Sequence, residues 1–146
     1  MRRDAKKIAA YYSSKYGTCD PFKIATALNI ELAIGDIGSR EGCYMYLKKH
    51  KCIFLNEHLD DVAARFVMAH ELGHAIMHPK ENCYFVRNKT LLLTSKTEIE
   101  ANQFAISLLL PDDLLAEYTD YDYTIGQISR ITGYQERLIE LRLDRY

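Results

Sequence analysis

The chain has 146 residues, the length of one domain with a single hydrophobic core. It is 48% hydrophobic and 27% charged, the balance of a soluble globular protein, and its net charge of −1 excludes a general attraction to nucleic acid or anionic membranes. No apolar run approaches the roughly 18 residues that a membrane span needs. Because the first residues also lack the apolar stretch of a secretion signal, we expect a cytoplasmic protein.

The first part of the chain is expected to contain two helices and three strands. The helices are predicted over residues 4–15 and from Pro21 onward, where Asp20 supplies the N-cap. A strand follows in the segment "IELAIG", and the segment "GCYMYLKKHKCIFLN" is typical of a hairpin with strands at 43–47 and 52–55. These elements precede the polar motif that identifies the candidate site.

Four cysteines occur, at Cys19, Cys43, Cys52 and Cys83. None forms a C-x-x-C pair or has the spacing of a zinc finger. Cys43 and Cys52 lie on the two strands of the predicted hairpin, where a disulfide is conceivable. Free thiols are the favoured interpretation because the expected compartment is reducing.

The second part of the chain is expected to be mostly helical. A long helix is predicted from Asp60 or Asp61 to His78, and an irregular segment with a short extended piece at 84–87 follows Pro79. The pattern Ser95-x-x-Glu98 resembles a capping box that opens a helix to Leu110. The remaining predictions are a helix at 112–118 and two helices around Thr132-Gly133. Since helices and strands are segregated, we predict an α+β fold.

The long helix carries polar side chains in the segment "FVMAHELGHAIMHP". His70 and His74 are four residues apart, so both lie on one face of the helix and are separated by one turn. Two imidazoles so placed can bind one metal ion, and Glu71 can reach a metal-bound water without being a ligand. Zinc accepts nitrogen and oxygen donors and keeps a fourth position open for water. The H-E-x-x-H pattern therefore predicts a zinc site.

The alternative is a chance cluster of surface histidines. The neighbours of the motif are apolar, which indicates a buried helix. Buried imidazoles and a buried carboxylate are costly unless each has a partner, and one metal ion would satisfy all three. We therefore favour the metal site.

A third ligand must come from outside this helix, since a catalytic zinc usually has three protein ligands. His78 lies about 12 Å along the helix from His70 and is expected at the helix end or in contact with a ligand. The helix that follows Ser95 offers Glu98 and Glu100. The helical wheel does not decide between them, and either could instead be a solvated carboxylate in the first turn.

These segments resemble the ImmA/IrrE family of metallopeptidases, which are often encoded on prophages and other mobile elements. The family pattern is an H-E-L-G-H helix followed by Glu-Ala-Asn, Phe-Ala and Leu-Leu-x-Pro. The chain matches it in "FVMAHELGHAIMH" and "EANQFAISLLLP", with Leu110 where Met is frequent. The segments "DPFKIATALNI" and "IFLNEHL" also fit, so the resemblance covers about the whole chain.

The resemblance implies a role for each candidate site residue. His70, His74 and Glu100 would bind zinc, and Glu71 would be the catalytic general base. It also implies a zincin-like fold, with a small, mostly antiparallel sheet packed on helices. Known family members cleave or inactivate repressors that carry a helix-turn-helix domain, so the expected partner is such a repressor.

We expect one domain, 1–146, with a catalytic core at 1–111 and a C-terminal helical subdomain at 112–146. In the expected mechanism, zinc lowers the pKa of its bound water toward ~7, and Glu71 moves the water's proton to the leaving amine. Tyr84, His78 and the C-terminal tyrosines are candidate oxyanion donors. The substrate is expected along the strand containing residues 42–47.

A second interpretation is a regulatory binding module that keeps zinc for folding. The segment "IGQISRITGYQERLIELRL" has the helix-turn-helix arrangement of a DNA reader. Its acidic residues offset its basic and amide groups, so packing is favoured over DNA binding. The intact Glu71 favours the enzyme, because a purely structural zinc site needs no general base.

Overall fold

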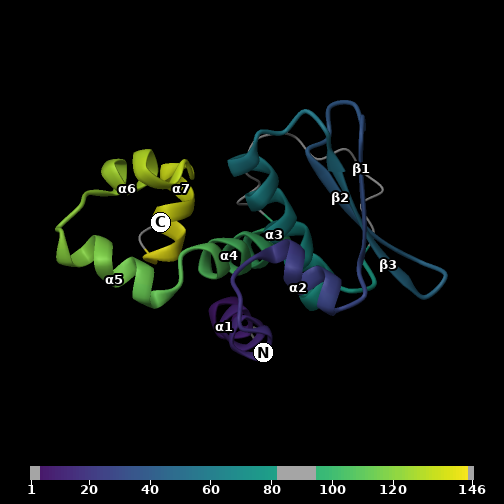
Figure 1. Ribbon diagram of the computed structural model, residues 1–146, viewed down its shortest axis with the longest axis horizontal. Helices are drawn as coiled ribbons and strands as arrows, with labels where there is room; N and C mark the ends of the chain where they lie inside the picture. The colour runs from purple at the N-terminus through teal and green to yellow at the C-terminus, as the bar shows by residue number, and fades with distance from the viewer. Residues whose placement is uncertain (1–3, 82–94, 145–146) are drawn as a thin grey trace.

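The computed structural model describes residues 4–81 and 95–144. Across these residues the fold is α+β, as predicted, with seven helices and a three-stranded sheet (Figure 1). The helices are α1 (Ala5–Tyr16), α2 (Pro21–Ala27), α3 (Asp61–Met77), α4 (Lys96–Leu109), α5 (Asp112–Asp120), α6 (Ile125–Thr132) and α7 (Glu136–Arg142). The strands are β1 (Glu31–Gly35), β2 (Gly42–Leu47) and β3 (His50–Asn56).

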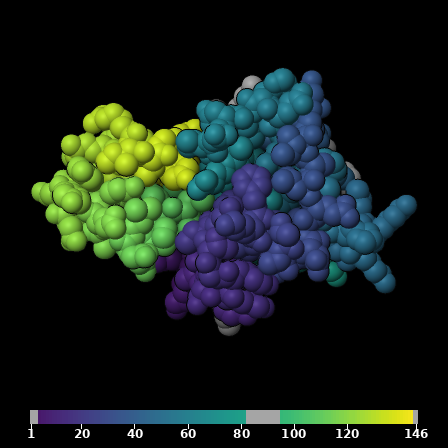
Figure 2. All heavy atoms as spheres, in the orientation of Figure 1, coloured from purple at the N-terminus to yellow at the C-terminus, as the bar shows by residue number. Residues whose placement is uncertain are grey.

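The sheet has the strand order β1-β3-β2. β2 and β3 form the predicted antiparallel hairpin, whereas β1 pairs with β3 in parallel, so the sheet is mixed. Among the described strands, β3 is central and β2 is an edge. Figure 2 shows the tip of the β2–β3 hairpin protruding from the surface.

Helices α3 and α4 form the centre of the molecule. Figure 1 shows them between the sheet at one end and α5–α7 at the other. α3 packs against β2, β3, α2 and α4, and its apolar side chains form one core with residues from the sheet and α1. A second core joins the end of α4 to α6 and α7 through Ile106, Leu110, Ile128, Leu138 and Ile139. No helix in residues 4–81 or 95–144 combines the length and hydropathy of a membrane span.

Local signals in the sequence determine where α3 and α4 begin. The side chain of Asp60 accepts a hydrogen bond from the Ala63 amide at 2.8 Å, and that of Ser95 accepts one from the Glu98 amide at 3.2 Å. The second half of the predicted capping box is not formed, because the Glu98 side chain turns toward the histidines of α3. That departure from a local rule brings a carboxylate into the candidate site.

Two glycines allow α3 to be approached closely. A Cβ atom at Gly42 would lie 2.5 Å from Val67 Cγ1, so β2 can pack on the helix only because this position lacks a side chain. A Cβ atom at Gly73 would lie 3.1 Å from the Phe104 ring of α4. The first approach positions a backbone amide of β2 beside the candidate site, and the second brings α4 close to the motif helix.

The C-terminal helices pack as the sequence favours. The guanidinium of Arg142, a basic residue of the segment that was weighed as a DNA reader, is buried. Its Nε donates to the Leu110 carbonyl at 2.8 Å and its Nη2 to Asp112 Oδ1 at 2.7 Å. Arg142 therefore joins α7 to the end of α4 and the start of α5 instead of facing solvent.

Three of the four cysteines lie among the described residues. No disulfide joins Cys19, Cys43 and Cys52 to one another, while Cys83 and the predicted extended piece at 84–87 lie outside the described residues. Cys43 faces Phe54 in the hairpin register, and Cys52 faces Met45. The two hairpin thiols are therefore not directly opposite each other.

We expect all four cysteines to react as free thiols when the protein is denatured without reductant. The measurement is a colorimetric thiol titration of freshly purified protein, compared with a fully reduced sample. Both samples should give four thiols per chain. A value near two in the unreduced sample would contradict both the thiol prediction and the expected reducing compartment.

Candidate active site

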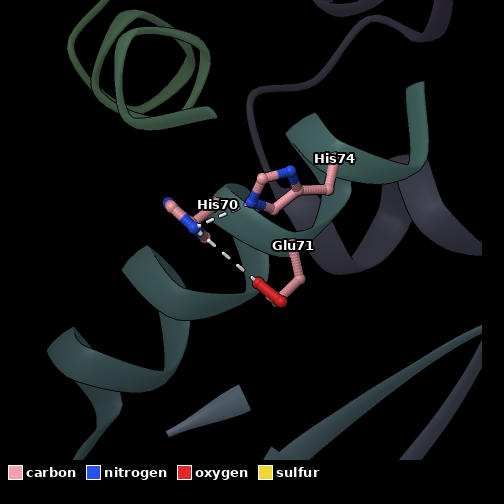
Figure 3. Close-up of side chains that lie close together, drawn as sticks. All are labelled: His70, Glu71 and His74. Atoms are coloured by element: carbon pink, nitrogen blue, oxygen red, sulfur yellow. Dashed lines mark hydrogen bonds and ion pairs between the residues drawn. The ribbon is translucent and has the colours of Figure 1, made fainter. Parts of the chain in front are cut away.

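Helix α3 brings His70, Glu71 and His74 together, as the spacing predicts (Figure 3). The Nε2 atoms of the two histidines are 3.2 Å apart, and Glu71 Oε2 lies 3.8 Å from His70 Nε2. The exposed fractions of the His70, Glu71 and His74 side chains are 12%, 2% and 3%, respectively. Two imidazole nitrogens and a carboxylate thus share a nearly buried space on one side of a central helix.

Glu98 of α4 completes this group. Its Oε2 lies 3.0 Å from His70 Nε2, and its Oε1 lies 3.1 Å from His74 Nε2. Burial alone would raise the pKa of Glu98, but the hydrogen bonds and charges of His70 and His74 outweigh burial and hold the pKa well below its usual range. Glu98 is therefore a carboxylate with both oxygens directed at the histidine pair.

Glu100, the third ligand expected from the resemblance, occupies a different position. It is buried, and its Oε1 lies 3.2 Å from Nε2 of His78, not beside His70 or His74. The geometry therefore favours Glu98 as the third ligand and places Glu100 beside the group. The sequence could not separate the two carboxylates, because the choice depends on how α4 crosses α3.

Two contributors to the site were not assigned roles from the sequence. Asn102 is buried, and its Oδ1 lies 2.7 Å from His70 Nδ1. The spacing of Glu98 and Asn102, four residues on one helix, is the signal that could have found it. The backbone amide of Tyr44 donates to Glu71 Oε1 at 3.0 Å, a contact with no sequence signature.

His78 lies at the C-terminal cap of α3, as predicted. Its Nδ1 is 3.0 Å from His74 Nδ1. Both ring nitrogens therefore contact neighbouring side chains, which disfavours His78 as the oxyanion donor. Tyr84, another candidate, lies outside the described residues. Tyr134 packs against Phe66, with ring centroids 6.4 Å apart, and Phe66 in turn packs against His70.

A pocket of about 320 Å³ lies beside the first turns of α3. Its apolar lining includes Phe66 and Val67, one turn before His70 and Glu71, and Leu138 of α7. Its charged lining residues, Glu41 and Asp60, are both acidic. The pocket is large enough to hold an amino-acid side chain next to the polar group.

The donors of this group suit a metal ion. In a tetrahedral site with bonds of about 2.1 Å, two donors lie about 3.4 Å apart. The contacts among His70 Nε2, His74 Nε2 and the Glu98 oxygens are 3.0–3.2 Å. Nitrogen and oxygen donors at this spacing fit zinc, and Glu71 lies beside them without occupying the same position.

Comparisons with known proteins agree with this chemistry. The model of a peptidase family, described as the IrrE N-terminal-like domain, matches residues 25–144. Uncharacterized immunity region protein 2 of Bacillus phage phi105 is 36% identical over 129 residues, which are 88% of this chain and 82% of that protein. Metallopeptidase ImmA of Bacillus subtilis (strain 168) is 33% identical over 108 residues, which are 73% of this chain and 63% of that protein.

The family match includes every residue of the group, from the histidines of α3 to the α4 carboxylates and Asn102. The α+β fold with a small mixed sheet is also that expected for a zincin-like protein. Both findings confirm the resemblance seen in the sequence. The chain belongs to the ImmA/IrrE family of metallopeptidases.

Proposed function

We propose that this protein is a zinc-dependent endopeptidase whose ligands are His70, His74 and Glu98 and whose general base is Glu71. The observation that carries the proposal is the convergence of the three ligands to 3.0–3.2 Å contacts beside a buried fourth group. A closed structural zinc site would use a fourth protein ligand, whereas three ligands and a nearby carboxylate suit catalysis.

The residues divide the chemistry among them. When bound, zinc supplies a Lewis acid that polarises the scissile carbonyl and lowers the pKa of water. Glu71 accepts a proton from the attacking water while the oxygen of that water bonds to the carbonyl carbon. Glu71 then delivers the proton to the leaving nitrogen as the C–N bond breaks. The Tyr44 amide holds Glu71 Oε1, which orients the carboxylate for this transfer.

We propose a helix-turn-helix repressor as the substrate and derepression of prophage or mobile-element genes as the result. The family resemblance supports this substrate, and so does the likeness to a protein named for a phage immunity region. The pocket beside His70 would take a side chain of the repressor next to the cleaved bond. Such a substrate is cytoplasmic, and we place the enzyme there.

We also propose a division of the chain into a catalytic core, 1–111, and a C-terminal helical subdomain, 112–146. The second hydrophobic core supports a packing role for the subdomain, because α6 and α7 bury apolar side chains against the end of α4. The buried Arg142 adds a polar connection at the same boundary. Direct contact with nucleic acid is not part of this function.

The substrate is tested by co-expressing the protein with a candidate helix-turn-helix repressor. We expect two repressor fragments on an immunoblot and activation of a reporter under that repressor, because cleavage separates the DNA-binding domain from the rest. Mass spectrometry of the fragments gives the cleaved bond. The matched control is the same pair with the Glu71→Gln variant.

The competing function is a zinc-containing binding module that removes the repressor by contact alone. In that case the Glu71→Gln variant would activate the reporter as well as the wild type, and neither would produce fragments. Reporter activation without fragments would reject the peptidase. A silent reporter together with an intact repressor would reject this repressor as the substrate.

A further inference from the structure

Three buried side chains form a chain of contacts that leads away from the proposed ligands. Glu100 Oε1 lies 3.2 Å from His78 Nε2, and His78 Nδ1 lies 3.0 Å from His74 Nδ1. The exposed fractions of the Glu100, His78 and His74 side chains are 9%, 7% and 3%. Burying three polar side chains is costly unless they satisfy one another, so the contacts indicate a specific arrangement.

The proton positions in this chain of contacts follow from chemistry. A carboxylate only accepts hydrogen bonds, so His78 Nε2 carries a proton and donates it to Glu100. In a neutral His78, Nδ1 is then an acceptor, and the proton of the next contact must come from His74 Nδ1. The lone pair of His74 is then on Nε2, the atom that faces His70 and Glu98, where a metal ion would take the place of the proton that Nε2 donates to Glu98 in the metal-free protein.

We infer that Glu100 and His78 are positioning residues that hold His74 in the tautomer and ring orientation needed to bind the metal. The inference rests on the proposed function, since it concerns the ligands of that site. Glu100 accepts a proton that His78 donates, and His78 accepts the one that His74 donates. An acceptor on the far nitrogen of a ligating histidine fixes the ring and strengthens the ligand.

The other histidine has a shorter version of the same arrangement. Asn102 Oδ1 lies 2.7 Å from His70 Nδ1, so an amide oxygen directly accepts the His70 proton. His74 is one turn further along α3, and there His78 stands between the ligand and α4. Helix α4 thus contributes one proposed ligand, Glu98, the direct acceptor of the His70 proton, Asn102, and the acceptor of the His78 proton, Glu100.

A buried carboxylate at position 100 has no other role visible among the described residues. Its Oε2 has no hydrogen-bond partner in that part of the chain, so the contact with His78 is what holds it. If Glu100 were itself a ligand, it would lie against His70 or His74. The two possible roles of Glu100 therefore predict opposite effects of Glu100→Gln on zinc affinity: little change for a positioning residue and a large loss for a ligand.

The test compares Glu100→Gln, Glu100→Ala and His78→Phe with the wild type and with Glu98→Gln. Zinc affinity is measured by competition with a chromogenic chelator, after circular dichroism has shown that each variant is folded. We expect Glu100→Gln to stay close to wild type, because its amide oxygen still accepts from His78. Glu100→Ala and His78→Phe should lose about 10–100-fold in affinity, and Glu98→Gln should lose more.

A second measurement reads the tautomers directly. In the zinc-loaded protein labelled with nitrogen-15 histidine, NMR should show His74 protonated on Nδ1 and His78 protonated on Nε2. In Glu100→Ala, the NMR signals of His74 should show a mixture of tautomers. The inference is overturned if His78 carries its proton on Nδ1, or if Glu100→Ala and His78→Phe bind zinc like the wild type.

The two proposals fail in different ways. A wild-type protein that binds no zinc would reject the proposed site and the positioning role with it. A zinc affinity that falls as far in Glu100→Gln as in Glu98→Gln would keep the zinc enzyme but make Glu100 a ligand. Normal affinity in all variants at positions 78 and 100 would keep the enzyme and remove only the positioning role.

Discussion

Glu71→Gln is expected to abolish cleavage while the fold and the metal are retained. The Glu71 side chain is 2% exposed and accepts a hydrogen bond from the Tyr44 amide, which the oxygen of an amide side chain can also accept. The substitution therefore preserves shape and removes the proton acceptor. Loss of a general base typically costs 10²–10⁴-fold in rate, about 3 to 5 kcal/mol of transition-state stabilisation.

The measurement is the rate of repressor cleavage by purified protein, with zinc content determined on the same samples. Glu117→Gln makes the same chemical change on the exposed surface of α5 and should cleave at the wild-type rate. If Glu71→Gln still cleaved within tenfold of the wild type, another group would have to be the base. If it lost zinc, Glu71 would belong among the ligands.

Local signals allowed much of the fold to be predicted. Five of the seven described helices begin at a residue whose side chain caps the first turn, including Asp20 before α2, Asp60 before α3 and Ser95 before α4. The hairpin followed from two runs of strand-forming residues around a lysine-rich turn. The parallel pairing of β1 with β3 did not follow, because it joins segments far apart in the sequence and leaves no local pattern.

The candidate site could likewise be predicted only where local sequence patterns determine it. The pair His70 and His74 follows from helical periodicity, and so does their proximity to Glu71. The assignment of Glu98 and Glu100 required the packing of α4 on α3, which the close contact of Gly73 with Phe104 helps to determine. The Tyr44 amide could not be anticipated either, because a backbone donor carries no residue signature.

The capping pattern at Ser95 also explains why the sequence was ambiguous at Glu98. A glutamate three residues after a capping serine ordinarily turns back to the cap. In this protein the same glutamate lies between two imidazoles, and its pKa is lowered by them. The Glu98 side chain can serve either the helix cap or the candidate site, and in this structure it contacts the two histidines instead of the cap.

Glu98→Ala is expected to remove the stabilisation that zinc gives to the folded protein. Zinc at 100 times its dissociation constant would stabilise the wild type by about 2.7 kcal/mol, which raises the melting temperature of a chain of this size by about 5 to 10 °C. Without the Glu98 carboxylate, only two of the three proposed ligands remain, and the rise at the same zinc concentration should disappear.

Thermal unfolding of metal-free protein, with and without added zinc, measures this difference for Glu98→Ala, Glu100→Gln and the wild type. Glu100→Gln should keep most of the zinc-dependent rise, because the contact of position 100 is with His78 and not with the proposed zinc ligands. The opposite result, a rise retained in Glu98→Ala and absent in Glu100→Gln, would restore Glu100 as the ligand. It would also mean that α4 binds the metal in a register different from the one in which Glu98 lies between His70 and His74.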